Sequence, residues 1–143
     1  MGKVTVKVKL ENVVDVALAE RGIIDAREVR RCEVDALADS GASFMCLPEE
    51  IVAQLGLEVF GTETARLATG ERHEVPLART LRIRIGERVA DQDCMVLPPG
   101  TQPLVGQWVL QEMDLVVDSR RERLVPGHSD ADGPVYDLLA HAG

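Results

Sequence analysis

Residues 39–41 carry the side chains best suited to chemistry in this chain. Asp39 supplies a carboxylate, Ser40 a hydroxyl group and Gly41 a position without a side chain, in direct succession. One interpretation is a surface turn, in which Asp39 bonds its own backbone and Gly41 adopts a positive φ. The flanking residues, 37–38 and 42–43, are apolar or small. They favour a carboxylate pressed into the protein, where it could act as a general acid or base.

The cysteines and histidines are weaker candidates. No two of them lie at a metal-ligand spacing such as C-x-x-C or H-x-x-x-H, so we expect no metal site and no cofactor. A cysteine protease could pair Cys46 with His73, but Cys46 lies in an apolar run, which indicates a buried and poorly ionised thiol. A nucleophilic Ser40 would need a histidine base, and none is near it in the sequence.

The elements that precede the candidate segment are a strand, a short helix and a second strand. Apolar and polar residues alternate over residues 4–10, which predicts a strand with one buried face. Asn12 is a candidate N-cap for a helix over residues 13–21, which Gly22 would end. A strand over residues 29–38 then leads directly into the candidate segment.

A second helix and a hairpin follow the segment. We predict a helix that begins at Pro48 and is ended by Gly56. Pro48 stands at a first helical position, two glutamates follow it, and Gly56 comes after an apolar stripe. Strands over residues 65–68 and 73–77 flank a hairpin tip at residues 69–70.

The rest of the chain up to residue 126 reads as short strands and one helical stretch. We predict strands over residues 81–85, 94–97 and 104–105, a helical stretch from Gly106 through Met113, and a closing hairpin of residues 115–117 and 123–125. Six or more short strands with one or two short helices indicate a mainly β domain over residues 1–126. A polar C-terminal tail over residues 127–143 follows it.

Composition limits the function classes. The 143 residues include 16 Lys and Arg against 24 Asp and Glu, for a net charge of -8, and only 3% are aromatic. The negative charge repels a phosphate backbone, and the few aromatic rings provide no platform on which bases could stack. We therefore expect no nucleic-acid partner. Charges interrupt every apolar run before it reaches a bilayer span, and three unpaired cysteines suit a reducing compartment. We therefore expect a cytoplasmic protein without a membrane partner.

Three stretches give the sequence its resemblance to the retropepsin-like aspartic proteases, the single-domain relatives of pepsin. They are the Asp39–Ala42 signature, the Leu47-Pro48 start of the next helix, and Leu104-Val105-Gly106 leading into Leu110. Within this group the chain is most similar to small prokaryotic members, over residues 3–126. The resemblance implies a closed β-barrel of the acid protease type, forming one half of a two-fold dimer.

The resemblance also implies the roles of the site residues. Asp39, Ser40 and Gly41 would be catalytic, with one Asp39 activating a water and a second Asp39 donating to the scissile carbonyl. Ser40 would bond across to the partner's loop, and Gly41 would let backbone N–H groups approach Asp39. The hairpin over residues 66–74 would be a flap above an extended peptide. The implied substrate-binding residues of flap and floor are Ala42, Ala68, Thr69, Gly70, Glu71 and Gly106.

A homodimer follows from counting the acids. The reaction needs two carboxylates that share one proton, because like charges so close together cannot both ionise. The chain holds one Asp-[Ser/Thr]-Gly triplet: Asp118-Ser119 is followed by Arg120, and Asp132-Gly133 lacks the hydroxyl residue. Two chains must therefore contribute one Asp39 each across a two-fold axis.

The leading hypothesis is a homodimeric aspartic endopeptidase acting on extended or unfolded peptide segments. An alternative is a dimer of the same fold that binds peptides without cleaving them, as an adaptor. A third is an Asp-dependent enzyme with a substrate other than protein. One departure from the family pattern is Trp108, where viral relatives usually carry a small polar residue. We expect this side chain at the dimer interface or under the candidate loop.

Overall fold

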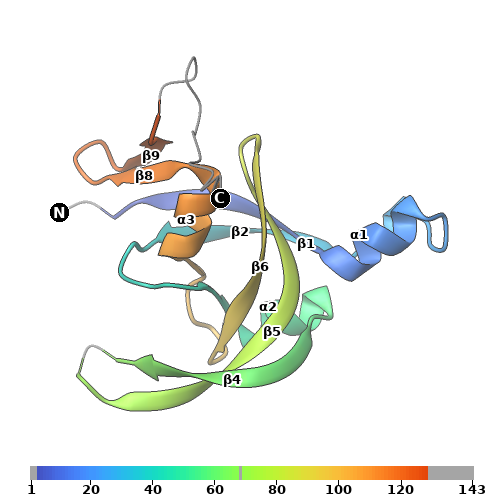
Figure 1. Cartoon of the computed structure of the whole chain (residues 1–143), viewed down its shortest axis with the longest axis horizontal. Helices are drawn as coiled ribbons and strands as arrows, with labels where there is room; N and C mark the ends of the chain where they lie inside the picture. The colour runs from blue at the N-terminus through green and yellow to red at the C-terminus, as the bar shows by residue number, and fades with distance from the viewer. Residues whose placement is uncertain (1–2, 68, 129–143) are drawn as a thin grey trace, which may run out of the picture.

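Nine strands and three short α-helices make up the part of the chain that the structure, a computed structural model, describes: residues 3–67 and 69–128 (Figure 1). In chain order they are β1 (Thr5–Asn12), α1 (Val13–Glu20), a 3-10 turn η1 (Ala26–Glu28), β2 (Arg31–Ala38), β3 (Met45–Pro48), α2 (Glu49–Leu55), β4 (Glu58–Arg66), β5 (Arg72–Ile85), β6 (Arg88–Leu97), β7 (Leu104–Val105), α3 (Gln107–Met113), β8 (Leu115–Asp118) and β9 (Arg123–Pro126).

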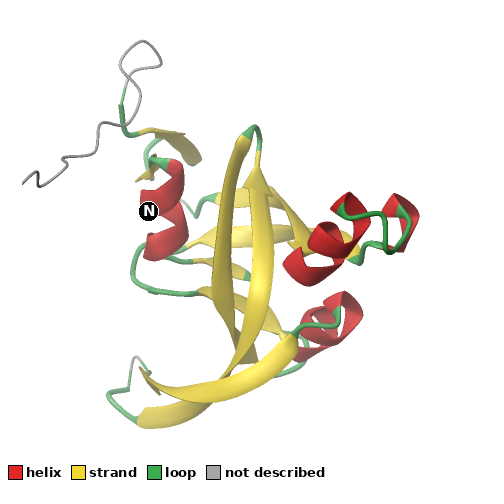
Figure 2. Cartoon of the chain, turned by 45° about the vertical axis from the view of Figure 1, so that its right-hand side comes forward, coloured by secondary structure: helices red, strands yellow, loops and turns green. Residues whose placement is uncertain are grey.

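Seven of the strands form one sheet that closes on itself. Their order is β1-β2-β7-β3-β6-β5-β4, and an additional antiparallel pairing of β1 with β5 joins the two sides into a ring. Strands β8 and β9 form a separate two-stranded sheet. The helices lie outside the ring (Figure 2). The predicted mainly β fold is confirmed.

The core inside the ring is aliphatic. Alternation along β1 buries Val8 and Leu10 completely and exposes Lys7 and Lys9, as the period of two predicts. The largest fully buried side chains come from β1, β3 and β5 and from the helices α2 and α3: Leu10, Met45, Leu47, Leu55, Leu81, Ile83 and Leu110. No aromatic residue is among the buried side chains in the described ranges.

The strands after α2 are longer than predicted. The expected strands over residues 73–77 and 81–85 are one strand, β5, whose pairing with β6 shifts register between Ala78 and Leu81. Leu77 and Ala78 are both buried there, which breaks the alternation that the sequence pattern relies on. Strands β4 and β6 also begin earlier than expected, because pairing with β5 extends them over residues that carry no clear strand pattern, most of them exposed in β4.

The first two helices begin close to where their caps predict. The Asn12 side chain accepts a hydrogen bond from the backbone N–H of Asp15 (3.1 Å) and donates to the Leu55 carbonyl (2.9 Å), so it also ties α1 to the end of α2. Helix α2 starts one residue later than predicted, because Pro48 is the N-cap and the last residue of β3. Gly56 ends it in the left-handed conformation. The described chain has three short α-helices, one at each helical stretch expected along the sequence, where the fold class had counted one or two.

Strand β9 ends at Pro126, the predicted end of the domain, and residues 129–143 of the predicted tail lie outside the described residues, as does Ala68. The domain boundary stays a prediction. Among the helices described, none is long and apolar enough to cross a membrane.

An ion pair with a buried carboxylate ties α1 to the residue that precedes β2. Asp15 is only 5% exposed. Its carboxylate accepts hydrogen bonds from the Arg30 guanidinium (2.8 and 2.9 Å) and from the Arg30 backbone N–H (3.0 Å). The side-chain bond to Arg30 holds the pKa of Asp15 below its ordinary value of 3.8.

We therefore expect Asp15→Asn to lower the free energy of unfolding at neutral pH by about 2 kcal/mol, since it leaves Arg30 without its carboxylate. Because the pKa of Asp15 is lower in the folded than in the unfolded state, the ion pair makes its full contribution to the free energy of unfolding above pH 3.8. This contribution is lost as the pH falls below that value. Urea unfolding at several pH values measures this. The curves of wild type and variant should converge in acid, whereas Asp35→Asn, at an exposed acid of β2, should change little. A difference in stability between wild type and Asp15→Asn that does not change with pH would contradict the role of the Asp15–Arg30 ion pair.

Candidate functional site

The candidate segment forms the loop between β2 and β3, residues 39–44, and the short strand β7 holds its base. Strand β7 pairs in parallel with the end of β2, where Leu37 and Ala38 oppose Leu104 and Val105, and antiparallel with β3. The backbone N–H of Asp39 donates to the Val105 carbonyl (2.9 Å). Asp39 is therefore anchored at its backbone by a strand about 65 residues further along the chain.

The start of α3 holds the other end of the loop. The backbone N–H groups of Gln107 and Trp108 donate to the carbonyls of Ala42 (2.7 Å) and Ser43 (3.1 Å). Gly106, the N-cap of α3, is buried against the loop. A Cβ at this position would overlap the Phe44 carbonyl and lie 2.6 Å from the Ser43 carbonyl oxygen. Only glycine allows the helix to approach this closely.

The Asp39 carboxylate is oriented by its own loop. Its Oδ1 accepts a hydrogen bond from the Gly41 backbone N–H (2.9 Å), and a Cβ on Gly41 would lie 3.1 Å from the same oxygen. Asp39 is half-buried, while Ser40 and Gly41 are exposed. Within the described chain, the carboxylate makes no other side-chain hydrogen bond and the Ser40 hydroxyl makes none. Both groups are thus free to bind water, substrate or another chain.

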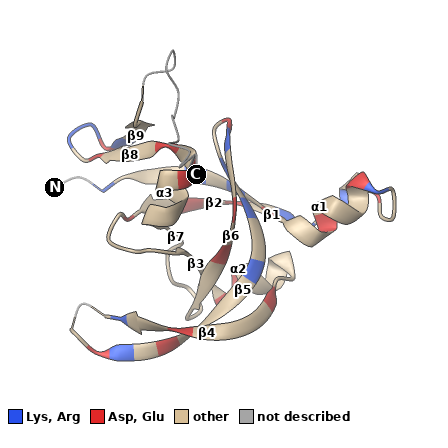
Figure 3. Ribbon diagram, in the orientation of Figure 1, with Lys and Arg blue, Asp and Glu red and all other residues tan. Residues whose placement is uncertain are grey.

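A groove of about 490 Å³ lies between this loop and the β4–β5 hairpin. The hairpin curves away from the ring (Figure 1), and both acidic and basic residues occur along it (Figure 3). The loop side is lined by Gly41, Ala42, Ser43, Phe44, Cys46, Leu104 and Trp108, the hairpin side by residues 63–67 and Val75, and the remaining wall by Met95 and Leu97 of β6. The groove therefore begins at the residues that orient Asp39.

The predicted substrate-binding residues fall in three places. Ala42 lines the groove. Thr69, Gly70 and Glu71 form the hairpin tip as predicted, where the N–H groups of Leu67 and Gly70 donate to the carbonyls of Glu71 and Leu67 (both 2.8 Å), but they do not line the groove of a single chain. Gly106 lies beneath the loop rather than in the groove wall. Ala68 is outside the described residues.

Several groove residues were not predicted. They are Phe44, Trp108 and residues 63–67. The sequence does not single out the apolar ones, because an apolar side chain in a groove wall is of the same residue type as one in the core. The sequence signal that could have found Trp108 was its position two residues after Gly106.

Thiol chemistry does not fit the site. Burial, together with the nearby Asp39 carboxylate, raises the pKa of Cys46 to about 11, so this thiol does not ionise at neutral pH. His73 hydrogen-bonds Glu71 (3.1 Å) and lines a different pocket from Cys46. Across residues 3–67 and 69–128, no three His, Cys, Asp or Glu side chains are grouped as a metal site would require.

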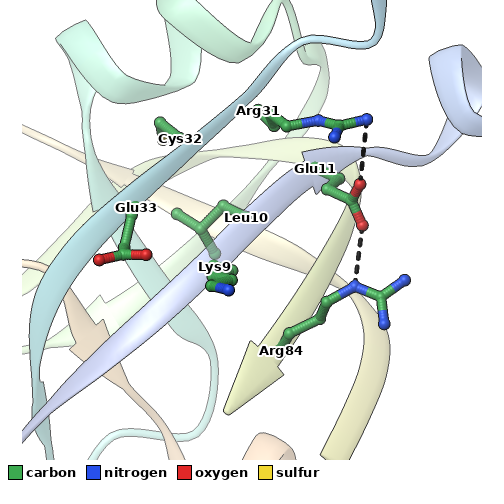
Figure 4. Close-up of a pocket in the computed structure, with 7 residues that line it drawn as sticks. All are labelled: Lys9, Leu10, Glu11, Arg31, Cys32, Glu33 and Arg84. Atoms are coloured by element: carbon green, nitrogen blue, oxygen red, sulfur yellow. Dashed lines mark hydrogen bonds and ion pairs between the residues drawn. The ribbon is translucent and has the colours of Figure 1, made fainter. Parts of the chain in front are cut away.

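A larger pocket, of about 530 Å³, lies on β1, β2 and β5, but three of its charged side chains, Glu11, Arg31 and Arg84, pair with one another (Figure 4). Glu11 is held between Arg84 (3.0 Å) and Arg31 (3.6 Å). Lys9 and Glu33 also line this pocket, and no predicted site residue does. We therefore take the smaller groove beside Asp39 as the candidate site.

Comparison with known proteins identifies the family of the chain. The model of one protein family, described as aspartyl protease, matches residues 12–119, a range that contains the loop, the hairpin and β7. No curated protein matches the chain.

The contact between Gly106 and the loop gives a direct test of the site's architecture. We expect Gly106→Ala to lower the free energy of unfolding by at least about 2 kcal/mol, because the added methyl group must displace the loop or α3. Gly61→Ala is the matched control, since a Cβ at Gly61 meets nothing within 4 Å. Urea unfolding of both variants makes the comparison. Equal stability of the two would show that the loop does not pack on Gly106.

Proposed function

The chain belongs to the aspartyl protease family, and on that premise we propose that it is an aspartic endopeptidase whose active site is completed by a second copy of the chain. One observation carries the proposal: the Asp39 carboxylate is oriented by the Gly41 N–H (2.9 Å) at the end of a groove, in a chain with one Asp-Ser-Gly triplet. A lone carboxylate cannot supply both the acid and the base that peptide hydrolysis requires. A two-fold axis beside the loop supplies the second.

In the proposed dimer the two Asp39 side chains share one proton. A water between them attacks the carbonyl carbon of the substrate as its proton passes to the ionised Asp39. The protonated Asp39 gives its proton to the carbonyl oxygen, which forms a tetrahedral diol. One diol hydroxyl then returns its proton to the ionised carboxylate, the carbon–nitrogen bond breaks, and the other Asp39 protonates the leaving amine. The pair titrates as a unit, so a pH profile reports constants of the dyad.

The other loop residues have supporting roles in this proposal. Ser40 is exposed beside Asp39, where its hydroxyl can donate to the partner's loop and hold the two carboxylates in one plane. Gly41 keeps its N–H close to the carboxylate because it has no Cβ. The β4–β5 hairpin acts as the flap, with Thr69 and Gly70 at its tip, and covers a peptide bound in extended form.

The first prediction of this proposal concerns Asp39. We expect Asp39→Asn to reduce kcat for cleavage of an unfolded protein by about a hundredfold or more, because neither chain then offers a base. Cleavage is measured from mildly acidic to neutral pH, at concentrations where sedimentation shows a dimer. Asp35→Asn removes an equal charge from the exposed face of β2 and should retain activity. Peptide binding without cleavage by either wild type or variant would favour the adaptor hypothesis, and a protein that stays monomeric would rule out the shared site.

The second prediction tests the sharing of the site between chains. When equal amounts of wild type and Asp39→Asn exchange subunits at constant total protein, activity should fall to about one quarter of that of wild type alone, because only wild-type homodimers carry two acids. Chains that act singly would retain about one half under the same conditions. The measurement is a titration of activity against the mixing ratio. A straight line would contradict the proposed dyad, and a quadratic curve would support it.

A further inference from the structure

The pocket on β1, β2 and β5 holds two arginines and the carboxylate that orients them (Figure 4). The Glu11 side chain is only 14% exposed; it accepts a hydrogen bond from Nε of Arg84 (3.0 Å) and lies 3.6 Å from Nη2 of Arg31. A guanidinium group has several further N–H donors. Among the described residues, the other nitrogens of both arginines have no acceptor. They are available to a ligand in the pocket.

Lys9 and Arg84 are like charges that lie directly opposite each other. The register of β1 with β5 pairs these two residues, and directly opposed like charges destabilise an antiparallel sheet. On its other side Lys9 lies opposite Glu33 of β2, but that carboxylate pairs with Lys7 (3.4 Å). Lys9 itself makes no ion pair within the described part of the chain. The repulsion between Lys9 and Arg84 is therefore uncompensated in the protein alone.

Arg82 lies on the same face of β5 and has the partner that Arg84 lacks. Its guanidinium binds both carboxylate oxygens of Asp91 on β6, each at 2.9 Å. The residue opposite Arg84 on β6 is Val89, which offers no carboxylate. The missing partner is thus a property of the pocket and not of the whole face.

The lining of the pocket has an excess of positive charge. Its cationic side chains are Lys9, Arg31 and Arg84, against the carboxylates of Glu11 and Glu33. The nearest partner of Glu33 lies outside the pocket, so one carboxylate faces three cations. In a chain of net charge -8, a concave site of the opposite sign attracts anions from solution.

We propose that this pocket binds a small molecule that carries a phosphate monoester, with the phosphate group held by Lys9, Arg31 and Arg84. Such a group carries about two negative charges at neutral pH and several acceptor oxygens. It matches three cations better than a single carboxylate does, and arginine forks fit its oxygens. The phosphate also replaces the repulsion between Lys9 and Arg84 with two attractions.

The rest of the pocket suits the remainder of such a molecule. The other lining residues, Leu10 and Cys32, are uncharged, and burial raises the pKa of the Cys32 thiol, so it adds no negative charge. A volume of about 530 Å³ is in the range of small-molecule sites. The pocket shares no lining residue with the groove beside Asp39, so this inference does not depend on the proposed function.

Isothermal titration calorimetry of the full chain tests the ligand class. The probes are inorganic phosphate, glucose 6-phosphate, glucose and succinate. Both phosphate compounds should bind saturably and about tenfold more tightly than succinate, glucose should not bind, and the affinity should fall as the ionic strength rises. Absence of binding by either phosphate compound, or succinate binding as tightly as they do, would overturn the proposal.

Variants locate the binding. Arg84→Gln and Lys9→Gln should each weaken the binding of inorganic phosphate by about tenfold. Arg82→Gln is the matched control, because it removes an equal charge from the same face of β5, and it should change the affinity little. Equal losses in all three variants would indicate general attraction by surface charge and overturn the site. If Arg84→Gln does not fold, Lys9→Gln and the control decide.

Thermal unfolding of the protein without ligand gives an independent readout. Lys9→Gln should raise the unfolding midpoint by about 2 °C, because it removes the repulsion from Arg84. Added phosphate should stabilise wild type more than this variant. A lowered midpoint for Lys9→Gln would mean that Lys9 already has a favourable partner, and it would overturn the proposal.

The Asp39→Asn variant separates the pocket from the proposed active site. It should bind inorganic phosphate as tightly as wild type does, whether or not wild type cleaves peptides. Loss of phosphate binding in this variant would place the anion in the groove and overturn the proposed pocket. Failure of Asp39-dependent cleavage would leave the pocket unaffected.

Discussion

The backbone contact between the Asp39 loop and the β7–α3 segment is the constraint on which the rest of the site depends. Hydrogen bonds from Asp39 to Val105 and from Gln107 and Trp108 to the loop carbonyls fasten both ends of the loop to a segment distant in sequence. This close approach has no room for a side chain at Gly106. A carboxylate on an unsupported loop would sample many orientations, whereas here backbone hydrogen bonds hold both ends of the loop.

The same contact links the chemistry to the groove. Because α3 begins directly after Gly106, its first turn brings Trp108 onto Phe44 and beside the Asp39 loop. The hairpin forms the opposite wall, and it belongs to strand β5, which continues into the ring through its pairing with β6 and β1. The Asp39 carboxylate, the Trp108–Phe44 pair and the hairpin are thus positioned by one closed set of strands. The second carboxylate of the proposed reaction must come from outside this set.

Much of the fold was predictable because the signals are local. Alternation along β1, the Asn12 and Gly56 caps, and the hairpin tip at residues 69–70 each depend on a few neighbouring residues. The predictions were incomplete where pairing overrides local pattern: β5 runs through two predicted strands, and exposed residues form the first half of β4 because β5 pairs with them. A strand edge offers hydrogen bonds to its neighbour whatever side chains that neighbour carries.

Residue types along the chain determined the candidate acid, its glycine neighbour and the mainly β class, because these follow from side-chain chemistry and short periodicities. Only the tertiary structure decided that β7 lies between β2 and β3, that Gly106 supports the loop from below, and that Trp108 faces the groove. The physical reason is that contact across a fold depends on elements far apart in sequence, while an apolar residue carries no mark that distinguishes a buried position from a groove wall.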